Sequence, residues 1–139
     1  MTAHVTASEV EEVVRKSLVS EGYVLSPNRV HGEGGADIIA VKGSEKIFIE
    51  AIAWKSSGPA RAKDFYEVFF RAVARLKDGA TKCVIALSSR ALAGFAQRTA
   101  YMGVAWNRIG TAFPELETWL VNVEEKTVEK TKWNSWRPT

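Results

Sequence analysis

The amino-acid sequence predicts an α/β domain in which helices cover both faces of a mixed β-sheet. Segments with helical spacing of apolar residues alternate with short apolar runs that are typical of strands. Their order is α-β-β-β-α-β-α-β, followed by a C-terminal β addition. Because helices are interleaved with the late strands, we expect a mixed sheet that is covered on both faces.

The length and composition suit one domain with a hydrophobic core. The chain has 139 residues, of which 46% are hydrophobic and 25% are charged, as in ordinary globular proteins. No linker or internal repeat divides the sequence. We therefore expect a single domain over residues 1–139, with a core at about 8–110 and a β extension at about 115–136.

The N-terminal half is expected to contain one helix and then three strands. Thr6 or Ser8 can cap the helix, and Gly22 can end it. A glycine-rich loop at 28–35 leads into an apolar hairpin with a turn at Gly43-Ser44. The expected strands are 23–25, 37–41 and 46–55.

The C-terminal half begins with the loop at 56–59 and a strongly amphipathic helix that ends at Asp78-Gly79. A continuous apolar run then has the pattern of a central strand, and a serine follows it as a cap for a third helix. The expected segments are a strand at 82–87, a helix at about 90–101, and strands at 103–109, 118–123 and 127–133.

Two carboxylates lie in the apolar hairpin. Asp37 opens its first strand and Glu50 lies inside its second. Buried carboxylates are rare unless they are paired or bind a metal, so the pair predicts a divalent-cation site. Two alternatives stay open: Asp37 can hydrogen-bond the glycine-rich turn, and Glu50 can lie on an edge face or in an ion pair.

The order of elements and these carboxylates together resemble the restriction-endonuclease-like fold. Within that superfamily the closest pattern is that of the small archaeal Holliday-junction resolvases, over Glu11 to about Ile109. The shared motif is a helix glutamate, a glycine-containing loop with a strand aspartate, and a Glu-x-Lys on the next strand. This chain has Glu11 or Glu12, then Gly34-Gly35-Ala36-Asp37, then Glu50-Ala51-Ile52.

The resemblance implies a metal-dependent nuclease that hydrolyses phosphodiester bonds of DNA, with branched or structured DNA as a possible substrate. Asp37, Glu50 and the main-chain carbonyl of Ala51 would bind Mg²⁺, or else Mn²⁺. Glu11 would assist. Its neighbours Val14 and Leu18 favour it over Glu12, although acidic residues in a first turn commonly serve the helix dipole.

The chain departs from the family at Ile52, which occupies the position of the motif lysine. Residues two apart in a strand share a face, so Ile52 projects beside Glu50. Lys55 could take the lysine role if the strand ends or bulges near Trp54, and Lys63 is a second candidate. An inactive nuclease-fold domain that binds nucleic acid or protein is the alternative function.

The expected partner is DNA. The net charge of +3 permits this contact, and Lys55, Arg61 and Lys63 are the candidate phosphate ligands. The resemblance also implies a homodimer, for which Trp133 and Trp136 are candidate surface residues.

No apolar run approaches the roughly 20 residues that span a bilayer, so no membrane contact is expected. The first residues show no signal-peptide pattern, and Cys83 is the only cysteine. We therefore expect a cytoplasmic protein.

Overall fold

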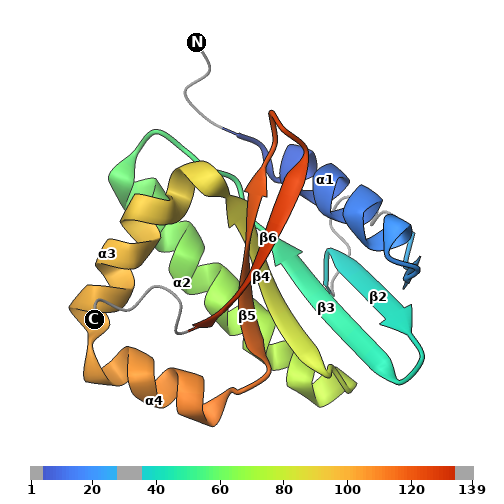
Figure 1. The fold of residues 1–139 in the computed structure, drawn as a ribbon. Helices are drawn as coiled ribbons and strands as arrows, with labels where there is room; N and C mark the ends of the chain where they lie inside the picture. The colour runs from blue at the N-terminus through green and yellow to red at the C-terminus, as the bar shows by residue number, and fades with distance from the viewer. Residues whose placement is uncertain (1–4, 28–35, 134–139) are drawn as a thin grey trace.

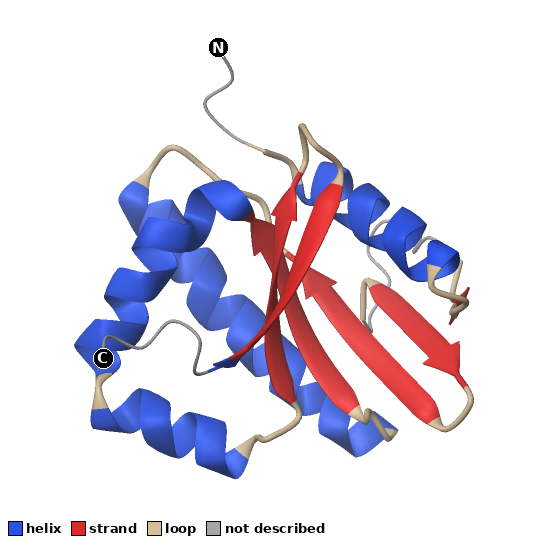
Figure 2. Cartoon of the chain, viewed as in Figure 1, coloured by secondary structure: helices blue, strands red, loops and turns tan. Residues whose placement is uncertain are grey.

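The computed structural model describes residues 5–27 and 36–133. One six-stranded sheet with strand order β1-β2-β3-β4-β5-β6 runs through the molecule (Figure 2). The strands are β1 (Val24–Leu25), β2 (Ile38–Lys42), β3 (Glu45–Ala51), β4 (Lys82–Ser88), β5 (Leu116–Asn122) and β6 (Thr127–Lys132). The helices are α1 (Ala7–Ser20), α2 (Gly58–Ala74), α3 (Leu92–Met102) and α4 (Val104–Ala112), with short 3-10 segments η1 (Arg75–Asp78) and η2 (Ser89–Ala91).

The sheet is mixed, as the sequence predicts. The strands β3, β4 and β5 are parallel, whereas β1, β2 and β6 join their neighbours antiparallel. Each parallel step needs a crossover, and α2 supplies the first while α3 and α4 supply the second. The strands β1 and β6 form the two edges of the sheet.

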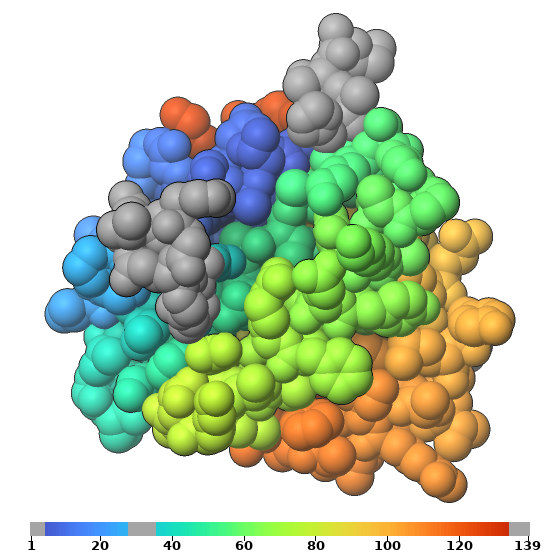
Figure 3. All heavy atoms as spheres, turned by 180° about the vertical axis from the view of Figure 1, so that it is seen from behind, coloured from blue at the N-terminus to red at the C-terminus, as the bar shows by residue number. Residues whose placement is uncertain are grey.

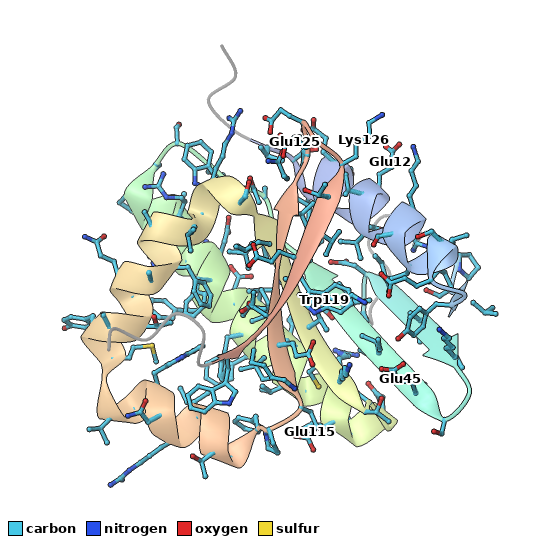
Figure 4. The ribbon with its side chains drawn as sticks, in the orientation of Figure 1. Glu12, Glu45, Glu115, Trp119, Glu125 and Lys126 are labelled. Atoms are coloured by element: carbon cyan, nitrogen blue, oxygen red, sulfur yellow. The ribbon has the colours of Figure 1, made fainter. Side chains whose placement is uncertain are left out.

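Helices cover both faces of this sheet (Figure 1). One face packs against α1, through a cluster that includes Val14, Leu18, Ile49 and Trp119. Figure 4 shows Trp119 on this side of the sheet. The other face packs against α2, α3 and α4, and Figure 3 shows α2 lying across it. The apolar stripe of α2 and the alternate residues of β4 meet there.

The first helix begins as the sequence suggests, with Thr6 as its cap. The Thr6 side chain accepts the Glu9 N–H, and the Glu9 side chain accepts the Thr6 N–H, which is a complete capping box. Two donors that would otherwise face solvent are thereby satisfied. The start of α1 is fixed by local sequence alone.

The predicted strand at 103–109 is wrong, because this segment belongs to helix α4. Gly103 has a φ of +52° and turns the chain between α3 and α4. After that turn Trp106 and Gly110 are buried on one side of the helix, at helical spacing. The strand that follows β4 is instead β5, so the C-terminal strands are integral to the sheet and β5 lies between β4 and β6.

Trp133, a candidate for a partner surface, is partly buried and packs against the apolar cluster of α2, α3 and α4. Its carbonyl oxygen accepts the indole N–H of Trp106 at 2.8 Å, and the two rings lie 6.5 Å apart. Trp133 also covers Gly110, where an added Cβ would lie 2.0 Å from Trp133 Cδ2. Trp136 and the glycine-rich loop at 28–35 lie outside the described residues.

A cleft of about 550 Å³ opens between α1 and the turn that joins β5 and β6. Figure 4 shows Glu12 and Lys126 at this end of the molecule, and both line the cleft. Its charges are of both signs, and neither Asp37 nor Glu50 lines it. No helix of the described residues is long and apolar enough to cross a membrane.

A side-chain hydrogen bond connects the segment after α1 to the β2–β3 hairpin. The hydroxyl group of Tyr23 donates a hydrogen bond to Glu45 Oε1 at 2.5 Å, and Figure 4 shows Glu45 near the hairpin turn. This hydrogen bond, with burial and the Glu45 charge, raises the pKa of Tyr23 from 10.0 to about 12. The same bond lowers the pKa of Glu45.

We expect Gly110→Ala to destabilise the protein by about 1–3 kcal/mol, because the new methyl group would overlap the Trp133 ring. In an open helix interior the same change stabilises by roughly 0.5–1 kcal/mol. Gly94→Ala in α3 is the control, since the atom nearest its new Cβ is the movable end of Arg98. Urea unfolding of both variants checks the sign. A more stable Gly110→Ala protein would contradict the packing of Trp133.

We also expect the contribution of Tyr23 to stability to disappear at alkaline pH. The folded-state pKa of about 12 exceeds the ordinary value of 10.0, so the folded protein holds this proton more tightly. The stabilisation is therefore complete below pH 10 and is lost as the pH rises from 10 to 12. Tyr23→Phe should cost about 1 kcal/mol at pH 8 and less at pH 11. Urea unfolding at both pH values measures the difference. A cost that stays constant would show that the Glu45 bond does not hold the proton.

Candidate metal and nucleic-acid site

The hairpin brings Asp37 and Glu50 to the same end of the sheet. In the antiparallel register Ile38 pairs with Ile49, so Asp37 lies one step beyond, opposite Glu50. The chain bends at Asp37, just before β2, and Asp37 Oδ2 accepts the Ala51 N–H at 2.8 Å. The Asp37 carboxylate therefore lies against the end of β3, beside the Glu50–Ala51 peptide.

Glu50 is a buried carboxylate that meets two arginines. Its side chain faces α2 and the residue is 1% exposed. Arg71 Nε lies 3.7 Å from Glu50 Oε1, and Arg75 Nε lies 3.8 Å from Glu50 Oε2. These positive charges offset part of the desolvation cost of an ionised carboxylate. Of the alternatives open for Glu50, the structure thus contains the ion pair.

Glu11 forms an ion pair with Arg15 of the same helix, and Arg15 contacts the start of β2. Arg15 Nε lies 3.2 Å from Glu11 Oε1, one helical turn away. The Arg15 guanidinium also donates to the carbonyl oxygens of Ser26 at 2.7 Å and Asp37 at 3.2 Å. Arg15 thus connects α1 to the start of β2, and Glu11 lies next to that connection.

Ile52 lies on the face of the sheet that Glu50 shares, as strand alternation predicts. It packs against the apolar cluster of α2, α3 and α4, and its N–H donates to the Ala86 carbonyl. The Lys55 ammonium group is paired with Asp64 Oδ2 at 2.9 Å, in a half-exposed position near the start of α2. Lys63 is exposed on α2.

The donor atoms at this end of the sheet suit a hard divalent cation. Asp37 and Glu50 offer carboxylate oxygens, and the Ala51 peptide lies between them and offers a carbonyl oxygen. Mg²⁺ is commonly held by one or two carboxylates while it keeps several waters. No group of three or more His, Cys, Asp or Glu among residues 5–27 and 36–133 is arranged to hold a metal.

Sequence reasoning did not predict that Arg71 and Arg75 pair with Glu50, nor that Arg90 and Arg98 lie near Trp54 and Arg61. Arg71 near the end of α2 and Arg75 at the start of η1 are four residues apart, which is a usable signal for a shared face. Arg90 follows β4 and Arg98 lies on α3, far from Glu50 in sequence. Nothing in their local pattern indicates that they come near Trp54 and Arg61.

Comparisons with known proteins give one match. No curated protein and no solved structure matches the chain. A family model, Mrr_cat, described as restriction endonuclease, matches residues 2–101, which contain Glu11, Asp37 and Glu50. The match spans most of the 139 residues. The mixed sheet with helices on both faces is consistent with this assignment. The chain therefore belongs to the Mrr_cat restriction endonuclease family, and its domain is of the nuclease type.

Proposed function

We propose that this protein is a metal-dependent endonuclease that hydrolyses phosphodiester bonds of DNA. The observation that carries the proposal is the hydrogen bond from the Ala51 N–H to Asp37 Oδ2, at 2.8 Å. It holds the Asp37 carboxylate against the strand that contains Glu50. Membership of a restriction endonuclease family supports the reaction class.

Asp37, Glu50 and the Ala51 carbonyl would hold the metal, with Glu11 assisting from α1. When bound, Mg²⁺ or Mn²⁺ stabilises charge on the scissile phosphate and lowers the pKa of a bound water. Arg71 and Arg75 lie 3.7 and 3.8 Å from the Glu50 carboxylate, which is too far for strong hydrogen bonds, so a cation that binds Glu50 would displace two weak contacts.

Lys55 takes the role of the motif lysine in this proposal, and Lys63 is the second candidate. The ion pair between Lys55 and Asp64 is half-exposed, and such pairs contribute only about 0–1 kcal/mol. The Lys55 ammonium group can therefore leave Asp64 at small cost when a phosphate arrives. Lys55, Arg61 and Lys63 are the proposed phosphate contacts.

The proposed substrate includes branched or structured DNA, and the proposed assembly is a homodimer. Both rest on the resemblance to junction-resolving nucleases, in which two copies cut two strands.

A catalytically silent domain that binds nucleic acid is the second candidate function. The observation that favours it is the apolar packing of Ile52 together with the Lys55–Asp64 pair. No lysine of the described residues forms an ion pair with Glu50 in this arrangement. Retention of DNA without cleavage, weakening as salt rises, is the result that would favour this candidate.

We expect the protein to cleave plasmid, linear or four-way-junction DNA with Mg²⁺ or Mn²⁺, and to stop when a chelator is added. Asp37→Asn should lower the cleavage rate by about 100-fold or more, because it removes a charged metal ligand. The asparagine carbonyl can still accept the Ala51 N–H, so the fold should persist. Gel assays of single-turnover cleavage measure the rate.

The matched control is Glu12→Gln, which removes an exposed carboxylate of α1 that pairs only at the surface with Lys16. It should leave cleavage within about twofold of the parent. Equal activity of Asp37→Asn and the parent on every DNA substrate would refute the proposed metal site.

We expect Lys55→Gln to lower the cleavage rate by about tenfold or more, with Lys63→Gln reducing it less. Lys77→Gln in η1 removes the same charge from an exposed position and serves as the control. Thermal unfolding should show similar stability for all three variants. If Lys63→Gln has the larger effect, the lysine role belongs to α2; if neither differs from Lys77→Gln, no lysine substitutes for Ile52.

A further inference from the structure

A shallow hollow beside the candidate site gathers positive charge. Its floor contains Ile52 and Trp54, which follow β3, and Leu87 of β4. Arg61 of α2 and Arg98 of α3 line its walls. The enclosed space is small, about 20 Å³, so the hollow is a shallow depression that opens to solvent. The hollow therefore lies at the carboxyl ends of two parallel strands, where open α/β sheets commonly bind ligands.

Arg61 is held in a defined position. Its guanidinium carbon lies 5.2 Å from the centre of the Trp54 ring, within the range of a cation–π contact. Its Nη1 donates to the Lys55 carbonyl at 2.7 Å. Arg90 approaches the same ring at 6.0 Å while it pairs with Glu124 at 2.8 Å. The Trp54 ring thus orients positive charge toward the hollow.

Arg98 adds a second positive charge to the hollow. Within residues 5–27 and 36–133, neither Arg61 nor Arg98 forms an ion pair with an acidic side chain. Burial and the nearby Arg61 charge lower the pKa of Arg98. Two like charges that converge in a partly desolvated place cost stability. Such a cost is typical of positions that are kept for function.

The hollow adjoins the proposed metal site. Ile52 forms part of its floor and lies two residues beyond Glu50 on the same face of the sheet. An anion in the hollow would therefore lie next to the position of the motif lysine. Guanidinium groups bind phosphate through paired hydrogen bonds, which a single ammonium group cannot form.

We propose that Arg61 and Arg98 form a subsite for a backbone phosphate of DNA, adjacent to the scissile phosphate. This subsite supplies positive charge that the chain lacks at Ile52. The identity of the ligand rests on the proposed function, whereas the presence of an anion subsite rests on the two arginines and Trp54.

The test is DNA binding without metal, so that it does not depend on cleavage. Fluorescence anisotropy in chelator measures the Kd of a labelled duplex at several salt concentrations, with either a 5′-phosphate or a 5′-hydroxyl end. Arg98→Gln and Arg61→Gln should each weaken binding by about tenfold and reduce the slope of log K against log salt by about 1. The loss should be equal on both duplexes.

Arg108→Gln is the matched control, because it removes one exposed guanidinium from α4. It should change the Kd and the slope less than either variant of the subsite. Thermal unfolding separates binding from structure: Arg98→Gln should unfold at the same temperature as the parent or higher, since it removes a desolvated like charge. A lower Tm would indicate a structural role for Arg98 and would overturn the proposal.

The outcomes for the two proposals are distinct. If the parent binds DNA and both subsite variants match Arg108→Gln, the subsite is refuted and the proposed nuclease function is untouched. A loss confined to the 5′-phosphorylated duplex would overturn the backbone assignment in favour of a terminal phosphate. If the parent binds neither duplex at any salt concentration, both the subsite and the proposed function fail.

Discussion

The burial of the Glu50 carboxylate is the constraint on which the arrangement of this domain depends. A carboxylate inside the sheet requires positive charge nearby, and Arg71 of α2 and Arg75 of η1 supply it. The pairing sets how α2 is rotated over the sheet, because both arginines must face Glu50. The same rotation directs the apolar stripe of α2 toward β4. The ion pairs with Glu50 and the apolar contacts with β4 therefore favour the same orientation of α2 over the sheet.

Asp37 and α1 complete the region from the other side. The Asp37 side chain is bound to the end of β3 and its carbonyl to Arg15, so one residue joins the hairpin to the first helix. The candidate site is thus assembled from three separate elements by hydrogen bonds between side chains and backbone. Any cation that binds Glu50 must compete with two arginines, which links metal affinity to the electrostatics of α2.

The hairpin and the positions of its two carboxylates can be predicted because the pattern that specifies them lies within one short segment of sequence. An apolar run, a glycine turn and a second apolar run specify the pairing, and the pairing places Asp37 opposite Glu50. The segment at 103–109 is ambiguous because Val104 and Trp106 fit strand alternation while Trp106 and Gly110 fit a helix. The approach of Arg90 and Arg98 to Trp54 and Arg61 depends on tertiary contacts between distant elements, which no local pattern records.

The two edges of the sheet have a consequence for how the protein behaves at high concentration. The β1 edge is only two residues long, and β6 carries the charged side chains of Glu129, Lys130 and Lys132. Short or charged edges discourage a second chain from adding a strand, although their backbone groups are open to pairing. The edges of the sheet therefore disfavour aggregation by sheet extension.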